Sequence, residues 1–134
     1  MDEIDKKIIE ILKEDASQPY TQIAKQVGLS EGAVRKRIQN LVKTGIIRKF
    51  TITLGIKEGI KAITLASAAS TPEVSKEILK LEGVETIYEI TGSYDIAAIL
   101  TAPNIEEINK CVDKIRNIPG ISNTNTMVVL RSYS

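Results

Sequence analysis

Apolar residues recur at helical spacing through the first part of the chain. Ile4, Ile8 and Ile11 are separated by charged residues and predict an amphipathic helix that ends near Glu14. A second amphipathic segment follows a short connector, and Pro19 can occupy its first turn, where a backbone N–H is not needed. The pattern therefore predicts two helices before the first glycine.

A tight turn and a third helix come next. Gly28 interrupts the apolar spacing where a helix end needs left-handed backbone, and Ser30 is a suitable N-cap. Val34, Ile38 and Leu41 then form one inward stripe. The stretch 20–41 is typical of a helix-turn-helix unit.

The outward face of this third helix is polar and cationic. At about 100° per residue, the positions opposite the apolar stripe are Gly32, Lys36, Gln39 and Lys43, with Arg35 beside them. Arg37 lies nearer the stripe, so a structural ion pair and a contact with an external partner are both open for it.

The segment after the third helix changes character. Gly45 ends the helix, and the β-branched run 46–54 predicts a strand pair. Helices followed by a strand pair predict a winged helix-turn-helix, with Arg48 and Lys49 on the wing near the backbone of bound DNA. The alternative is that these two charges only protect a solvated strand edge.

The rest of the chain predicts a second domain after a short hinge at 55–60, which contains two glycines. The expected elements are a strand over 62–69, a helix over 71–81 capped by Thr71 with Pro72 at its first position, strands over 84–91 and 96–101, a helix opened by the Asn104 and Glu107 capping pair, and a strand over 121–130. The helix-to-strand joints at 81–84 and 118–121 share one design. The fold class is therefore α+β: an N-terminal winged helix-turn-helix (1–54) plus a C-terminal ferredoxin-like βαββαβ domain (61–134). The open sheet face of such a domain favours pairing with a second copy.

Charge divides the chain in the same way. Residues 1–57 hold 11 Lys and Arg against 7 Asp and Glu, whereas residues 58–134 hold 7 against 10. A cationic first half indicates a polyanionic partner for that half, and double-stranded DNA is the one its fold predicts. We expect bases to be read by Arg35, Lys36 and Gln39, and phosphates to be bound by Lys43, Arg48 and Lys49; the candidate DNA-binding set also includes Ser30 and Gly32.

Composition argues against several kinds of chemistry. The chain has no histidine and one cysteine, Cys111, so we expect no metal site, no cofactor and no catalytic centre. Glu85 and Glu89 are about 13 Å apart if they lie on one strand, too far for paired acid–base work. No apolar run approaches the roughly 18 residues of a membrane span, and the acidic start is unlike a signal peptide, so we expect a cytoplasmic protein.

The combined motifs resemble those of the Lrp/AsnC family of transcription regulators, also called feast/famine regulatory proteins. The resemblance covers essentially the whole chain and is carried by Gly28-Leu29-Ser30, by Gly45-Ile46-Ile47, and by the turn Gly92-Ser93-Tyr94-Asp95, which fits the family's Gly-x-x-Asp turn. It implies a DNA-binding homodimer, assembled further into tetramers of dimers, that responds to a small amino acid bound between dimers.

By position, the resemblance implies an effector site formed by Gly92, Ser93, Tyr94 and Asp95, with Thr124 and Thr126 as hydroxyl donors. Asp95 would face the effector's ammonium group, and the turn N–H groups and the hydroxyls would face its carboxylate. The alternative for the turn is that it only joins two strands. Two other functions stay open: an interaction module that oligomerises without effector control, and an enzyme of small substrates, which lacks a visible catalytic constellation.

Overall fold

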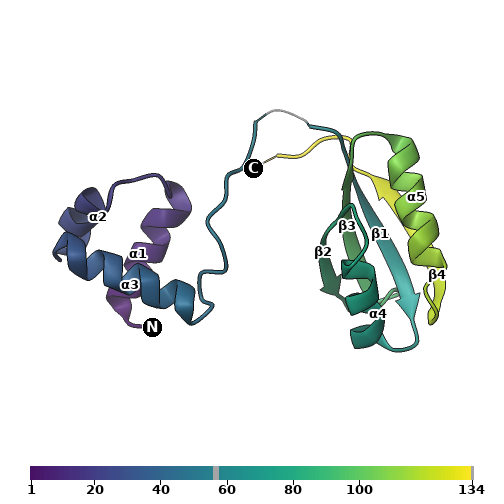
Figure 1. Ribbon diagram of the computed structural model, residues 1–134, viewed down its shortest axis with the longest axis horizontal. Coiled ribbons are helices and arrows are strands. Elements are labelled where there is room, and N and C mark those ends of the chain that lie inside the picture. The colour runs from purple at the N-terminus through teal and green to yellow at the C-terminus, as the bar shows by residue number, and fades with distance from the viewer. Residues whose placement is uncertain (56–57, 134) are drawn as a thin grey trace. The chain divides into compact units, whose positions relative to one another are not determined.

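The computed structural model describes residues 1–55 and 58–133 (Figure 1). The chain divides into two compact units, Met1–Thr53 and Leu54–Ser134. The predicted hinge, 55–60, includes residues 56–57, which lie outside the described residues, and its last position, Ile60, begins a strand. The hinge and the domain limits 1–54 and 61–134 therefore stay predictions.

The first unit is built from the helices α1 (Glu3–Glu14), α2 (Tyr20–Val27) and α3 (Glu31–Lys43). Ile8, Ile23 and Val34, one from each helix, are fully buried in a shared core. Removing each such side chain from water contributes about 1.5–3 kcal/mol, so the apolar stripes hold the helices together. The predicted helix-turn-helix is confirmed.

Local signals fix the turn between α2 and α3. Gly28 has φ +72°, the left-handed conformation expected at a helix end. The Oγ atom of Ser30 accepts a hydrogen bond from the N–H of Ala33 at 3.1 Å, which makes it the predicted N-cap of α3. Pro19 lies one position earlier than expected, at the N-cap of α2 rather than inside its first turn.

The strand pair expected over 46–54 does not form in the described residues, which carry no strand before β1. A hairpin needs a turn, and this run has no Gly, Asn, Asp or Pro to make one. Ile52 is 77% exposed, so the segment also lacks a sheet edge to pack on within its own unit. The expected wing is corrected to an extended segment that follows α3.

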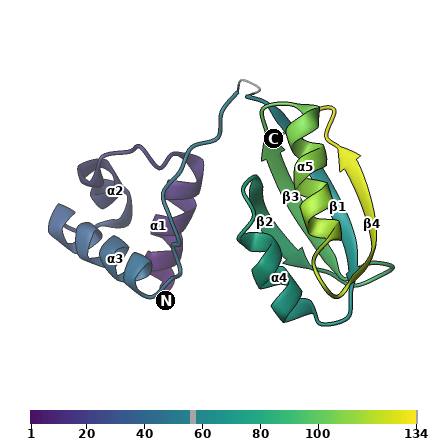
Figure 2. The same ribbon diagram turned by 45° about the vertical axis from the view of Figure 1, so that its right-hand side comes forward.

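The second unit contains the elements β1 (Ile60–Ala68), α4 (Thr71–Leu79), β2 (Val84–Glu89), β3 (Ile96–Ala102), α5 (Ile105–Arg116) and β4 (Ile121–Val128). The strands pair antiparallel in the order β2-β3-β1-β4. Figure 2 shows α4 and α5 over the same face of this sheet. The predicted ferredoxin-like βαββαβ domain is confirmed.

The helix caps of this unit agree with the sequence in one case and differ in the other. The side chain of Asn104 accepts a hydrogen bond from the N–H of Glu107 at 2.9 Å, as predicted for α5. The N-cap of α4 is Ser70 instead of Thr71, which already lies in the helix. The side chain of Ser70 makes no capping hydrogen bond to the helix backbone, and its hydroxyl bonds the carboxylate of Glu73 instead.

The two faces of the sheet differ. Ala62, Ala66 and Leu100 point toward the helices and are buried in the core between the layers. Ile63 of β1 is paired with Ile99 of β3 on the opposite face, where both are only half-buried. The described elements of this unit therefore leave an apolar sheet face uncovered.

Candidate nucleic-acid interface and effector site

The exposed face of α3 is the first candidate site. The apolar stripe of α3 is buried, and the opposite positions Gly32, Lys36, Gln39 and Lys43 are all exposed. A Cβ added at Gly32 would meet no atom within 4 Å, so internal packing does not require glycine there. Because Gly32 has no side chain, a partner could approach the helix backbone closely at this position, beside the cationic side chains.

The other candidates on this side have different surroundings. The Oγ of Ser30 accepts the capping hydrogen bond of α3, so Ser30 has a structural role that is independent of DNA. Arg48 and Lys49 are exposed, but they lie on the extended segment after α3 and not on a strand. The wing position that was expected for them is therefore not observed.

Arg35 is held by two neighbours. Its Nη2 lies 2.7 Å from a carboxylate oxygen of Glu31, one helical turn earlier. Its guanidinium carbon also lies 5.1 Å from the ring centroid of Tyr20, at the start of α2, which is within the range of a cation–π contact. The Arg35 side chain is nevertheless 52% exposed, so it stays accessible.

Arg37 is directed toward α1 and is paired within its own unit. Its Nη1 lies 2.7 Å from Asp2 and 3.1 Å from Asp5, both at the start of α1. The hydrogen bond from Arg37 holds the pKa of the Asp2 carboxyl below its ordinary value, and the two carboxylates raise the pKa of Arg37. Of the two roles left open by the sequence, the structure shows the ion pair, which joins α3 to α1.

The turn between β2 and β3 is tied to the end of β1 through Asp95. The carboxylate Oδ2 of Asp95 accepts from the N–H of Ala68 at 2.9 Å, and its own N–H donates to the carbonyl of Ala66 at 2.9 Å. Gly92 has φ +115°, a backbone conformation that other residues rarely adopt, and nothing lies near its absent side chain. The turn is thus both structurally anchored and open on one side.

The two threonines expected at the effector lie on the other side of β1. Thr124 is paired with Ala66 and accepts a hydrogen bond at 3.0 Å from Nε of Arg116. Thr126 is hydrogen-bonded at 2.9 Å to the hydroxyl of the buried Thr64. Because β1 separates β4 from β3, the backbone of Thr124 lies about 10 Å from that of β3 near Asp95, and Thr126 lies two residues further along β4. The two threonines and Asp95 are thus held by separate hydrogen bonds.

Comparison with known proteins decides the family. A sequence model of the AsnC-type helix-turn-helix domain matches residues 1–42, and a model of the Lrp/AsnC ligand binding domain matches residues 60–134. The chain belongs to the Lrp/AsnC family. It is 48% identical over 136 aligned positions to the HTH-type transcriptional regulator LysM of Sulfurisphaera tokodaii, covering 99% of this chain and 97% of the relative.

Solved structures share the whole fold of this Lrp/AsnC protein. The crystal structure of PH0061 has a TM-score of 0.87 at 25% identity and is matched over 100% of this chain and 95% of that one. The regulator NMB0573 of Neisseria meningitidis, solved as a complex with L-methionine, has a TM-score of 0.80 at 20% identity, with 100% and 92% covered.

These findings make the chain a DNA-binding transcriptional regulator of the Lrp/AsnC type and not an enzyme. Within residues 1–55 and 58–133, no group of three or more Cys, Asp or Glu side chains is arranged to hold a metal ion. No helix in that part of the chain is long and apolar enough to cross a bilayer.

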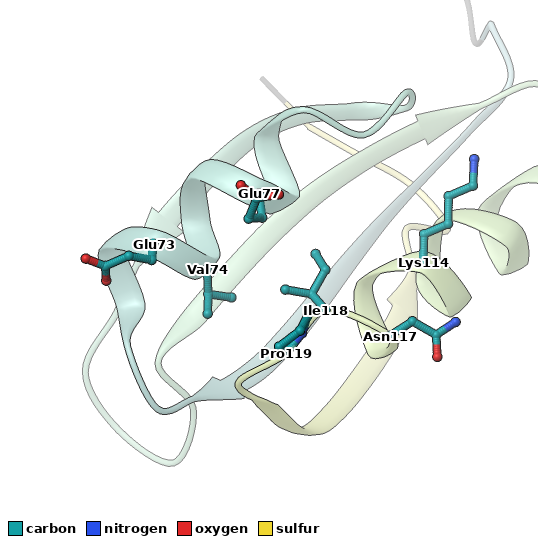
Figure 3. Close-up of a pocket in the computed structure, with 7 residues that line it drawn as sticks. All are labelled: Glu73, Val74, Glu77, Lys114, Asn117, Ile118 and Pro119. Atoms are coloured by element: carbon teal, nitrogen blue, oxygen red, sulfur yellow. The ribbon is translucent and has the colours of Figure 1, made fainter.

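A hollow of about 510 Å³ lies elsewhere on the second unit, between α4 and the end of α5. Figure 3 shows Val74 and Ile118 pointing into it, whereas the charged ends of Glu73 and Lys114 diverge. The hollow therefore lacks converging polar groups, and the residues predicted for the effector do not line it.

Sequence reasoning missed some of the contacts around these sites. The i,i+4 spacing of Glu31 and Arg35 was a sufficient signal for their ion pair. The stacking of Arg35 on Tyr20 and the contact of Arg116 with Thr124 join separate elements, so no local pattern could have indicated them.

Proposed function

We propose that this Lrp/AsnC regulator binds DNA through the exposed face of α3 and binds an amino acid through its second unit. The observation that supports the DNA interface is the contrast between the two sides of α3, one buried and one cationic. Arg35, Lys36 and Gln39 would read base edges, while Lys43, Arg48 and Lys49 would neutralise phosphates. Ser30 and Gly32 border the same face.

The DNA interface is tested by the salt dependence of binding to a fluorescent duplex. A dimer that contacts roughly six phosphates gives a log–log slope of about −5, and Lys43→Ala should weaken binding to every duplex and reduce that slope. The control is Lys76→Ala, which removes the same charge from an exposed site on α4. Salt-independent binding of the unmodified protein would refute the interface.

The proposed effector site is centred on Asp95. One of its carboxylate oxygens is bound to the N–H of Ala68, and the other is available to accept from an ammonium group. Thr124 accepts from Arg116, so its own hydroxyl hydrogen can still be donated to a carboxylate. The complex of NMB0573 with L-methionine supports an amino acid as the kind of effector.

The effector site is proposed to include residues of more than one copy of the chain. The backbones of β3 and β4 are about 10 Å apart with β1 between them, and the Asp95 carboxylate is bound against β1. We propose that the effector lies between two copies, with Asp95 of one copy and Thr124 of another in contact with it, as the family resemblance implies. Gly92, Ser93 and Tyr94 would lie with Asp95, and Thr126 beside Thr124.

The effector site is tested with Asp95→Asn in calorimetric titrations with L-methionine and L-lysine. Asparagine keeps an oxygen for the N–H of Ala68 but loses the negative charge, so effector binding should weaken at least tenfold while DNA binding without effector is unchanged. Glu106→Gln, which removes the same charge from an exposed position of α5, is the control. Unchanged affinity in Asp95→Asn would contradict the assignment.

The homodimer is proposed to form through the uncovered sheet face. Ile63, Leu65 and Ile99 are only half-buried there, and a second copy would remove them from water. Leu65→Asp should shift the mass measured by light scattering to that of a single chain. We also propose that dimers assemble further, for example into a tetramer of dimers, and that the protein acts in the cytoplasm.

A further inference from the structure

Arg35 differs from the other cationic groups on the exposed face of α3. The side chains of Lys36 and Lys43, and that of the neutral Gln39, form no hydrogen bond or ion pair with other described residues. Arg35 is contacted from two directions, by the Glu31 carboxylate at 2.7 Å and by the Tyr20 ring at 5.1 Å from its centroid. Among the described residues of this face, it is the side chain that has such contacts before any partner arrives.

The platform under Arg35 is itself fixed. Tyr20 is the first residue of α2 and packs against the core of the helical unit, so its ring cannot follow the guanidinium freely. Glu31 is the first residue of α3, directly after the Ser30 cap. The two contacts therefore come from two helices whose relative position is set by the helix-turn-helix core.

We propose that Tyr20 and Glu31 are positioning residues that hold Arg35 ready to read the edge of a guanine in the major groove. This inference rests on the proposed DNA interface. An arginine that loses little rotamer freedom on binding gains more from each hydrogen bond it forms. The first turns of the second helix of a helix-turn-helix face the base edges, which is where these residues lie.

Guanine is the base that fits the remaining donors. Arginine has five N–H donors, and the Glu31 contact involves Nη2. The other N–H groups suffice for the paired contact with O6 and N7 of guanine, the commonest specific contact of arginine. Stacking on Tyr20 sets the plane of the Arg35 guanidinium, so its paired hydrogen bonds to guanine would point in one preferred direction.

Glu31 should also affect overall DNA affinity, and in the opposite direction to its effect on the preference for guanine. Its negative charge near the phosphates lowers affinity for every duplex, so Glu31→Gln should raise binding to random DNA. If Glu31 also positions Arg35, the same change lowers the preference for guanine. An ordinary exposed helix pair would give the first effect without the second.

The test is selection of bound duplexes from a random pool, followed by affinity measurements on the selected site and on its single-base variants. The unmodified protein should select a guanine at one position of each half-site, and Arg35→Lys, which keeps the charge but not the planar fork, should lose it. Tyr20→Leu should reduce the preference for guanine about tenfold, while Tyr20→Phe retains it because the ring alone provides the stack. In Tyr20→Leu the loss of preference for guanine should exceed any change in affinity for random duplex, measured in the same titrations.

The outcomes separate this inference from the interface on which it rests. If binding depends on salt and Arg35→Lys loses the guanine, but Tyr20→Leu and Glu31→Gln keep it, the positioning role is overturned and the interface stands. If Arg35→Lys also keeps the guanine, Arg35 is not the reader and the inference fails. If the unmodified protein shows no salt-dependent binding, both fail together. Thermal unfolding of each variant identifies a loss that comes from folding, and Glu31→Gln, at an exposed position, then decides the result.

Discussion

The hydrogen bond between Thr64 and Thr126 gives a sharp test of how the last strand is held. Thr64 is 0% exposed, and its hydroxyl lies 2.9 Å from that of Thr126, which is only half-buried on β4. The two single changes to valine are therefore not equivalent. Thr126→Val leaves a buried hydroxyl without this partner, at a cost of about 1–3 kcal/mol, whereas Thr64→Val leaves a hydroxyl that water can reach, at about 0.5–1.5 kcal/mol.

The double variant decides between this account and simple loss of packing. With both hydroxyls removed, no unpaired polar group remains. The loss of unfolding free energy in Thr64→Val/Thr126→Val should therefore be smaller than the sum of the two single losses, by about 1 kcal/mol or more. Urea unfolding followed by circular dichroism measures all four proteins. Strictly additive effects would refute the reasoning, because they would mean that the two hydroxyls do not depend on each other.

The same four proteins test the effector role of Thr126. If Thr126 only supports β4, effector affinity should follow stability and recover in the double variant. If its hydroxyl contacts the effector, affinity should stay low in the double variant, although the buried hydroxyl is gone. Calorimetric titration with the effector distinguishes the two patterns.

Further predictions concern backbone, charge and thiol. Gly59→Ala should destabilise the protein by about 2–5 kcal/mol in urea unfolding, because φ is +80° and the new Cβ would lie 2.5 Å from a backbone carbonyl oxygen; Gly45→Ala, at the same φ but in open space, should cost only about 1–2 kcal/mol. Asp2 has its pKa lowered by Arg37, so its contribution to stability is present above the ordinary value of 3.8 and is lost as pH falls below it; the melting temperature of Asp2→Asn should therefore depend less on acid. Burial raises the pKa of the Cys111 thiol, so its reaction with a thiol reagent should be slow in the native protein and fast in urea.

The structural features that depend on a few neighbouring residues could be predicted from the sequence. The left-handed glycine and serine cap before α3 were read correctly, as was the capping pair before α5, because each depends on residues within one turn. The prediction of a strand pair over 46–54 was wrong because strand pairing depends on more than the local sequence. A β-branched run shows that a segment can be extended, but a strand also needs a partner, which the run itself does not specify.

The site residues show the same limit. The positions of Lys36 and Gln39 on an exposed helix face follow from periodicity alone. The partner of Arg37 could not be deduced, because Asp2 is distant in sequence and either solvent or α1 could have faced the arginine. Asp95 was expected at a ligand, and its bond to Ala68 depends on how β1 lies against the turn.

The distribution of charge on α3 makes cooperation between copies a requirement of the proposed DNA interface. Arg37 is paired with Asp2 and Asp5, so one copy presents only a few cations to a duplex, and few phosphate contacts give weak binding. Two copies in fixed register add their contacts on half-sites one helical turn apart, or a multiple of it. An effector that contacts Asp95 of one copy and Thr124 of another would bind one arrangement of copies more tightly than the rest. It could then change DNA affinity without touching α3, by no more than its difference in affinity for those arrangements.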